Sequence, residues 1–159
     1  MRWGANVADE GQMTKVLPPV YFFAAIAFAL LANFVFPLDV LIPFGWRFAG
    51  LAPLAAGIAL NIAADRQFKL RGTTVKPFQS SSALVTDGVF GWSRNPMYLG
   101  MVLIVAGVAI LLGSVTPWIA VAVLAVLLDR VFIAREETML AGTFGAAFED
   151  YRARVRRWL

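Results

Sequence analysis

The chain has 159 residues, of which 60% are hydrophobic and 15% are charged, and its mean hydropathy is +0.72. This composition excludes an ordinary soluble domain and is typical of an integral membrane protein of about one domain, here taken as 1–159. The net charge of +4 indicates attraction to lipid headgroups and not a nucleic-acid partner, and the lack of Cys and His excludes disulfides, thiolate chemistry and the commonest metal ligands.

The N-terminal half predicts two membrane spans. Residues 1–15 are polar and lack the order of a signal peptide, so we expect the apolar segment after them to stay in the protein. Residues 16–36 form an uncharged run that is long enough to cross the roughly 30 Å hydrocarbon layer. A short turn leads to a second span at 48–64, in which alanines recur at helical spacing and indicate close packing against another helix. These alanines are Ala52, Ala55, Ala59 and Ala63.

The C-terminal half predicts a helical hairpin of two further spans. A long polar segment, 65–94, precedes the third span at 97–113, and a loop of that length in a small membrane protein is usually functional. A tight turn at 114–116 leads to the fourth span at 117–128. Asn95 and Thr116 are N-cap residues, and each is followed by a proline, which favours a helix start.

The distribution of positive charge predicts the orientation. All Lys and Arg residues except Arg47 lie in the N-terminal arm, in the 65–94 segment or in the chain from Asp129 onward. Four spans place these three regions on one side of the membrane, and the positive-inside rule makes that side cytoplasmic. The expected location is therefore a cytoplasmic membrane of prokaryotic type.

The chain is organised around residues 84–100, LVTDGVFGWSRNPMYLG, where a glycine-punctuated loop enters the third span. A helix start presents unpaired N–H groups and a partial positive charge, which favour a carboxylate or a phosphate. Phe90, Trp92 and Tyr98 cluster around this start. They are either interfacial anchors or walls around an adenine or a sulfonium group.

Charged residues follow the fourth span. Glu136 and Glu137 form either an ion-paired helix exit or a binding site for ribose hydroxyls or a cationic centre. Arg130 lies seven residues before Glu137, so an α-helix would place the two on one face. Asp129 is close enough to the span end for its charge to reach the interface.

The tail carries apolar residues at the spacing of one helix face, which is typical of a helix in the headgroup layer. Gly142 and Gly145 are expected to divide it into two pieces. The residues of this face are Leu140, Phe144, Phe148, Tyr151, Val155 and Trp158.

Four short motifs, in order, resemble the isoprenylcysteine carboxyl methyltransferase family and the related phospholipid methyltransferases. They are LVTDG followed by Phe90, then RNPMYLG from Arg94, EETML from Glu136, and FGAAFEDY from Phe144. The resemblance covers roughly residues 70–159. It implies an all-α integral membrane enzyme with about four transmembrane helices, a cytoplasmic cofactor-binding loop and an amphipathic C-terminal helix, using S-adenosylmethionine.

The resemblance also implies site residues. The family's cofactor contacts fall on Ser82, Ala83, Leu84, Val85, Phe90, Asn95, Pro96, Met97, Tyr98 and Glu136. Its substrate-contacting arginine falls nearest Phe132, so Arg130 or Arg135 is the candidate; Arg130 and Glu137 are taken as the candidate catalytic residues. The family's usual histidine is replaced by Asn95, which cannot accept a proton near pH 7.

The predicted function is methyl transfer from S-adenosylmethionine to a lipophilic or membrane-embedded acceptor, a carboxylate or an amine, without a metal. The acceptor is expected to enter sideways from the lipid. Two alternatives stay open: a membrane reductase that uses a nicotinamide cofactor, and a non-catalytic membrane scaffold of the same fold.

Overall fold

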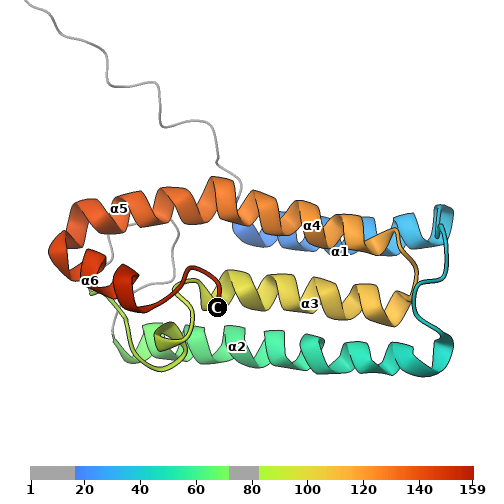
Figure 1. The fold of residues 1–159 in the computed structure, drawn as a ribbon, viewed down its shortest axis with the longest axis horizontal. Helices are drawn as coiled ribbons and strands as arrows, with labels where there is room; N and C mark the ends of the chain where they lie inside the picture. The colour runs from blue at the N-terminus through green and yellow to red at the C-terminus, as the bar shows by residue number, and fades with distance from the viewer. Residues whose placement is uncertain (1–16, 72–82) are drawn as a thin grey trace, which may run out of the picture.

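The computed structural model describes residues 17–71 and 83–159, which are almost entirely helical (Figure 1). Four long rods lie side by side, and the short α6 folds back at one end. The elements are α1 (Pro18–Val35), η1 (Phe44–Gly50), α2 (Leu51–Leu70), η2 (Gly88–Gly91), α3 (Pro96–Leu112), α4 (Pro117–Leu127), η3 (Leu128–Ile133), α5 (Ala134–Phe144) and α6 (Ala146–Arg154).

The rods have the length and composition of membrane spans. Three helical stretches, Pro18–Val35, Phe44–Leu70 and Pro117–Phe144, are long and apolar enough to cross a bilayer, and α3 is a shorter apolar helix beside them. The predicted all-α membrane fold with about four spans is confirmed. Helices α3 and α4 form the expected hairpin, and α3 packs against α1, α2 and α4.

Helix α2 differs from the prediction in its length and in its packing face. It runs to Leu70, so the first residues of the predicted polar loop are helical, and Asp65 and Lys69 form an i,i+4 ion pair at 2.6 Å. Ala52, Ala55 and Ala59 are exposed. The alanine face is therefore not the one that meets α3.

The contact between α2 and α3 is instead made by glycines. A Cβ atom added to Gly57 would lie 2.5 Å from the carbonyl oxygen of Gly100, and one added to Gly50 would lie 2.5 Å from that of Gly107. Because neither partner has a side chain at these points, the two backbones touch. This close contact fixes α3 against α2, with the start of α3 near the C-terminal end of α2.

Helices α4 and α5 are one continuous rod joined by the π-helical turn η3. Asp129 and Arg130 were expected to interrupt the fourth span before it continues, and the chain instead passes through them without a break, as a wider turn. Such turns are frequent at functional sites. Because a π turn winds more loosely than an α turn, Arg130 and Glu137 do not share a face as an uninterrupted α-helix would require.

The tail forms two helical pieces, as predicted, but the point of division and the packing face differ in part from the prediction. Gly145, at φ +51°, separates α5 from α6, whereas Gly142 lies within α5. Phe148 and Tyr151 are buried, so the apolar face of α6 packs on the protein and not on lipid.

Candidate functional site

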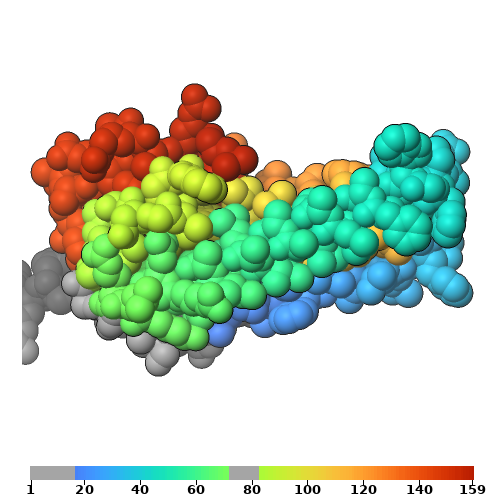
Figure 2. Space-filling view, turned by 90° about the horizontal axis from the view of Figure 1, so that it is seen from below, coloured from blue at the N-terminus to red at the C-terminus, as the bar shows by residue number. Residues whose placement is uncertain are grey.

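Two polar blocks of the sequence, residues 84–100 and the chain from Asp129 onward, meet at one end of the bundle. In Figure 1 the chain before α3 lies beside α6 and the C-terminus, and Figure 2 shows these segments in contact on the surface. The most direct link is the hydroxyl of Tyr98 in the first turn of α3, which donates to the Glu136 Oε1 atom in α5 at 2.6 Å. Residues 38 positions apart in the sequence therefore share one hydrogen bond.

Aromatic rings support this pair from the bundle side. The Tyr98 ring is buried and lies 6.4 Å from that of Phe132 in η3, centroid to centroid. Phe132 in turn packs edge-on against Tyr21 of α1, at 5.6 Å. Apolar side chains of α1, α3 and η3 thus lie on the bundle side of the Tyr98–Glu136 bond, and such surroundings strengthen a hydrogen bond to a carboxylate.

A second apolar cluster lies on the α2 side of the same helix start. Val85 and Phe90 are buried with Ala64, and Phe68 and Met97 pack against them. The rings of Phe68 and Phe90 meet edge-on at 4.9 Å. Leu84 and Ala83 precede this cluster and are partly exposed; Ser82 lies outside the described residues.

Tyr151 of α6 is linked to this cluster through the backbone of Phe90. Its hydroxyl donates to the carbonyl oxygen of Phe90 at 2.7 Å, and burial raises the pKa of this phenol to about 12. The phenol is neutral at pH 7 and remains a donor. It therefore holds α6 against the η2 turn.

A buried ion cluster lies next to the Tyr98–Glu136 pair. Arg94 donates to the Glu137 Oε1 atom through Nη2 at 2.7 Å and Nε at 3.2 Å, and the two side chains are only 9% and 11% exposed. Arg157 reaches the same carboxylate from the tail at 2.5 Å. Adjacent glutamates thus have different partners: Glu136 binds a phenol and Glu137 binds two guanidinium groups.

The last residues of the chain are tied into this cluster. Asp129 accepts from Arg157 Nη1 at 3.3 Å and from the indole Nε1 of Trp158 at 3.1 Å. Arg94 Nη1 donates to the carbonyl oxygen of Val155 at 2.6 Å. Hydrogen bonds to Glu137 raise the pKa of Arg157 above its usual value, so this residue is cationic at all relevant pH values. We call residues 155–158 the C-terminal strap.

The strap also determines what Asn95 does. Asn95 occupies the N-cap position of α3, but its side chain makes no capping bond and instead donates to the carbonyl oxygen of Arg157 at 3.1 Å. The prediction that its side chain caps the helix is wrong, because the bond from its amide nitrogen to the strap turns the side chain toward the tail and away from the first-turn N–H groups. The same holds at Thr116, whose hydroxyl donates to the carbonyl oxygen of Phe36. Pro96 is buried, and the first turn of α3 has no side-chain cap.

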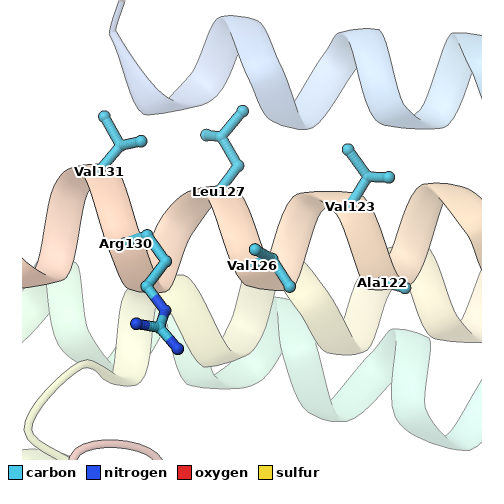
Figure 3. A pocket seen from close by; sticks show the side chains of 6 residues that line it. All are labelled: Ala122, Val123, Val126, Leu127, Arg130 and Val131. Carbon is cyan, nitrogen blue, oxygen red and sulfur yellow. The ribbon is translucent and has the colours of Figure 1, made fainter.

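Arg130 is placed apart from these residues. Its side chain is 82% exposed and makes a weak contact with Asp129 at 3.5 Å. It borders an open groove along α4 and η3, where Figure 3 shows Val123, Leu127 and Val131 projecting toward α1 and Arg130 projecting away from it. Ala122 and Val126 complete an otherwise apolar lining. Among the described residues, no interaction joins Arg130 to Tyr98 or Glu136.

Sequence reasoning missed most of the residues that hold the site together. Arg94 appeared only as part of a motif, and Arg157 was one of the basic residues from Asp129 onward that served only to predict the orientation. Their burial against Glu137 depends on contacts between residues 20 and 43 positions apart. The one available signal was that Glu137 and Asp129 are carboxylates beside apolar segments, which require partners.

No group of three or more His, Cys, Asp or Glu side chains that could hold a metal ion is found within residues 17–71 and 83–159.

The chain is similar to known membrane methyltransferases. A family model described as phospholipid methyltransferase matches residues 46–147. A protein of Haemophilus influenzae with no assigned function is 38% identical over 63 residues, which are 40% of this chain and all of that protein. The protein-S-isoprenylcysteine O-methyltransferase of Schizosaccharomyces pombe is 33% identical over 75 residues, which are 45% of this chain but only 30% of that enzyme.

A solved structure shares the fold. It is that of the eukaryotic intramembrane Ras methyltransferase, isoprenylcysteine carboxyl methyltransferase, with a TM-score of 0.62 and 22% sequence identity. The match covers 89% of this chain and 51% of that one, so the chain spans about half the length of the solved enzyme.

Proposed function

Because the chain belongs to the phospholipid methyltransferase family, we propose that it transfers the methyl group of S-adenosylmethionine to a lipophilic acceptor in the membrane. The observation that carries this proposal is the Tyr98–Glu136 hydrogen bond, which joins the two polar blocks at 2.6 Å. S-adenosylmethionine carries a carboxylate, an amino group and ribose hydroxyls, so a site for it is best served by an anion-binding group and a carboxylate close to one another. Tyr98 and Glu136 bring the uncapped start of α3 and a carboxylate together.

The side chains around this bond fit S-adenosylmethionine. The first-turn N–H groups of α3 suit the carboxylate of the methionine part, since no side chain caps them. Glu136 suits ribose hydroxyls or the amino group, and Tyr98 fixes its orientation. The buried ring of Phe90, with Val85 and Met97 around it, offers an apolar wall for the adenine, and the chain at 83–84 leads into that wall.

When bound, S-adenosylmethionine would supply a sulfonium methyl group. A nucleophilic oxygen or nitrogen of the acceptor would form a bond to this methyl carbon, and the electron pair of the broken C–S bond would stay on sulfur. The residues of this chain contribute by binding and by alignment, which can account for a large part of a rate enhancement. Asn95 cannot accept a proton near neutral pH, and its amide is already bonded to the strap. An ionised carboxylate acceptor needs no base, so this arrangement favours a carboxylate over an amine.

Arg130 and the groove beside it suit such an acceptor. The apolar side chains of the groove match a hydrocarbon chain, and the exposed guanidinium group that borders it matches an anionic group. The proposed route is sideways from the lipid, where a lipophilic acceptor is already concentrated. We assign Arg130 to acceptor binding and Glu137, which is held by Arg94 and Arg157, to positioning the neighbouring Glu136. The site is proposed to face the cytoplasm, from the distribution of Lys and Arg.

The direct test uses the purified protein in lipid nanodiscs with S-adenosylmethionine labelled in its methyl group. We expect label to pass into the organic extract of supplied lipids or prenylated acids, and Glu136→Gln to lower the rate at least tenfold. The matched control is Glu149→Gln, which removes an exposed carboxylate on α6 and should leave the rate unchanged.

Two results would contradict the proposal. Tight binding of the labelled cofactor without transfer to any lipid fraction would favour a non-catalytic scaffold of the same fold. Binding of a nicotinamide nucleotide in competition with S-adenosylmethionine, together with hydride transfer, would favour a reductase.

A further inference from the structure

The segment between α1 and α2, residues 36–48, carries an unusually apolar exposed surface. It lies at the end of the bundle opposite the C-terminal strap, where Figure 2 shows it in cyan. Its only charged residues are Asp39 and Arg47. Seven large apolar side chains in this segment are more than half exposed: Phe36, Leu38, Val40, Leu41, Phe44, Trp46 and Phe48.

The backbone of this segment is held in place by the turn between α3 and α4. The N–H groups of Leu41 and Ile42 both donate to the carbonyl oxygen of Gly113 at 2.9 Å, and Val115 N donates to the carbonyl oxygen of Asp39 at 3.2 Å. These polar groups are thus paired inside the protein. A non-helical segment can lie in the membrane only if its backbone N–H and C=O groups have hydrogen-bond partners within the protein.

The one cation of the segment is folded back onto the protein. Arg47 is partly buried, its Nε atom donates to the carbonyl oxygen of Ile42 at 3.1 Å, and its guanidinium group lies 6.0 Å from the centre of the Phe44 ring. It also covers Gly113, where an added Cβ atom would lie 2.2 Å from Nε. The outward face of the segment is therefore left to apolar and aromatic side chains.

The lengths of the neighbouring helices place this face relative to a bilayer. Helix α3 has 17 residues and α1 has 18, which at 1.5 Å per residue span about 25 and 27 Å. The hydrocarbon layer is about 30 Å thick. If the ion cluster at the start of α3 lies at one boundary, the far ends of both helices stop short of the other boundary. The segment 36–48 then fills the remaining depth.

We propose that residues 36–48 form an interfacial cap embedded in the leaflet opposite the candidate site, with their outward side chains in contact with lipid. Trp46 and Phe44 lie where aromatic side chains anchor proteins between acyl chains and headgroups. The cap closes the far end of the α1–α4 bundle without an aqueous loop. This inference depends only on the membrane fold and holds whichever acceptor is methylated.

The test uses single-cysteine variants, which are unambiguous because the chain has no native Cys. Trp46→Cys and Val40→Cys carry a spin label in nanodiscs, and collisions with oxygen, which enters lipid, are compared with collisions with a water-soluble nickel chelate. We expect the oxygen-to-nickel ratio to be several-fold higher at both positions than at Asp150→Cys, an exposed position on α6. Two positions are used so that one poorly folded variant does not decide the result.

Two outcomes would overturn the proposal. Nickel collisions at positions 46 and 40 as frequent as at position 150 would make the segment an aqueous loop. Dipolar broadening between labels that disappears when each nanodisc holds a single copy would assign this face to a second copy of the chain and not to lipid.

Discussion

Tyr98 and Glu136 are the two side chains through which the account can be tested most finely. Tyr98→Phe removes one hydroxyl and keeps the ring that packs on Phe132. A hydrogen bond to a carboxylate contributes about 1.5–3 kcal/mol, so we expect cofactor affinity to fall about ten- to hundredfold, since each 1.4 kcal/mol corresponds to tenfold. Calorimetric titration with S-adenosylmethionine measures this. An unchanged affinity of Tyr98→Phe for S-adenosylmethionine would show that the Tyr98–Glu136 pair does not belong to the cofactor site.

The ion cluster makes a contrasting prediction about stability. Arg94→Ala removes one partner of a buried pair and leaves Glu137 with an incomplete set of donors, so we expect a loss of about 3 kcal/mol in the free energy of unfolding. Arg71→Ala is the matched control. Its pair with Asp87 is shorter, at 2.5 Å, but both side chains are more than half exposed, so we expect less than about 1 kcal/mol. Denaturant titration in mixed micelles measures the free energy of unfolding of both variants. Equal losses would show that burial does not determine how much the Arg94–Glu137 pair contributes to stability.

At the scale of elements, the close contact between α2 and α3 determines where the start of α3 lies. Gly57→Ala would place a Cβ atom 2.5 Å from the carbonyl oxygen of Gly100. The helices must then separate, and we expect a loss of about 1–3 kcal/mol with weaker cofactor binding. Gly142→Ala is the control, because an added Cβ atom there has no neighbour within 4 Å. It should be neutral or slightly stabilising. If an unfolding experiment showed that Gly142→Ala costs more stability than Gly57→Ala, the glycine contact would be excluded as a determinant of the fold.

The C-terminal strap acts on two other elements. Arg157 bonds to carboxylates in both η3 and α5, and its carbonyl oxygen accepts from Asn95. Removal of residues 155–159 should leave the membrane helices intact but take away one of the two guanidinium partners of Glu137 and the Val155 carbonyl group that Arg94 also binds, which loosens Glu137 and the neighbouring Glu136. We therefore expect cofactor binding to weaken by at least tenfold while helix content, measured by circular dichroism, is nearly unchanged. Full binding by the truncated protein would restrict the strap to a role in surface packing.

Elements were more predictable than their contacts. The spans follow directly from apolar runs, since a bilayer requires a certain length of uncharged helix. The alanines of the second span were predicted to pack against another helix, but the face of α2 that meets α3 carries Gly57, which with Gly100 allows a closer approach than any side chain. The continuous rod from Pro117 to Phe144 was also missed. A π turn accommodates Asp129 inside a helix by giving it Arg157 and Trp158 as partners.

At the scale of the whole molecule, the bundle has two chemically different ends. One end gathers buried charges around Glu137 and the Tyr98–Glu136 pair, and the other ends in the apolar segment 36–48 (Figure 2). The motifs that resemble a methyltransferase family predicted the first end in part. The partners of Glu137 did not follow from the sequence, because Arg94 and Arg157 were two of many basic residues, and only the folded chain shows which ones are buried.

The central claim is that the two polar blocks form one binding site for S-adenosylmethionine. The most direct measurement is a double-mutant cycle in which the affinity for this cofactor is titrated for the wild type, Tyr98→Phe, Glu136→Ala and the double variant. We predict one cofactor bound per chain and a double variant little weaker than Glu136→Ala alone, because the Tyr98 hydroxyl acts on the cofactor only through Glu136. A wild-type protein that does not bind S-adenosylmethionine, or losses that simply add, would contradict it.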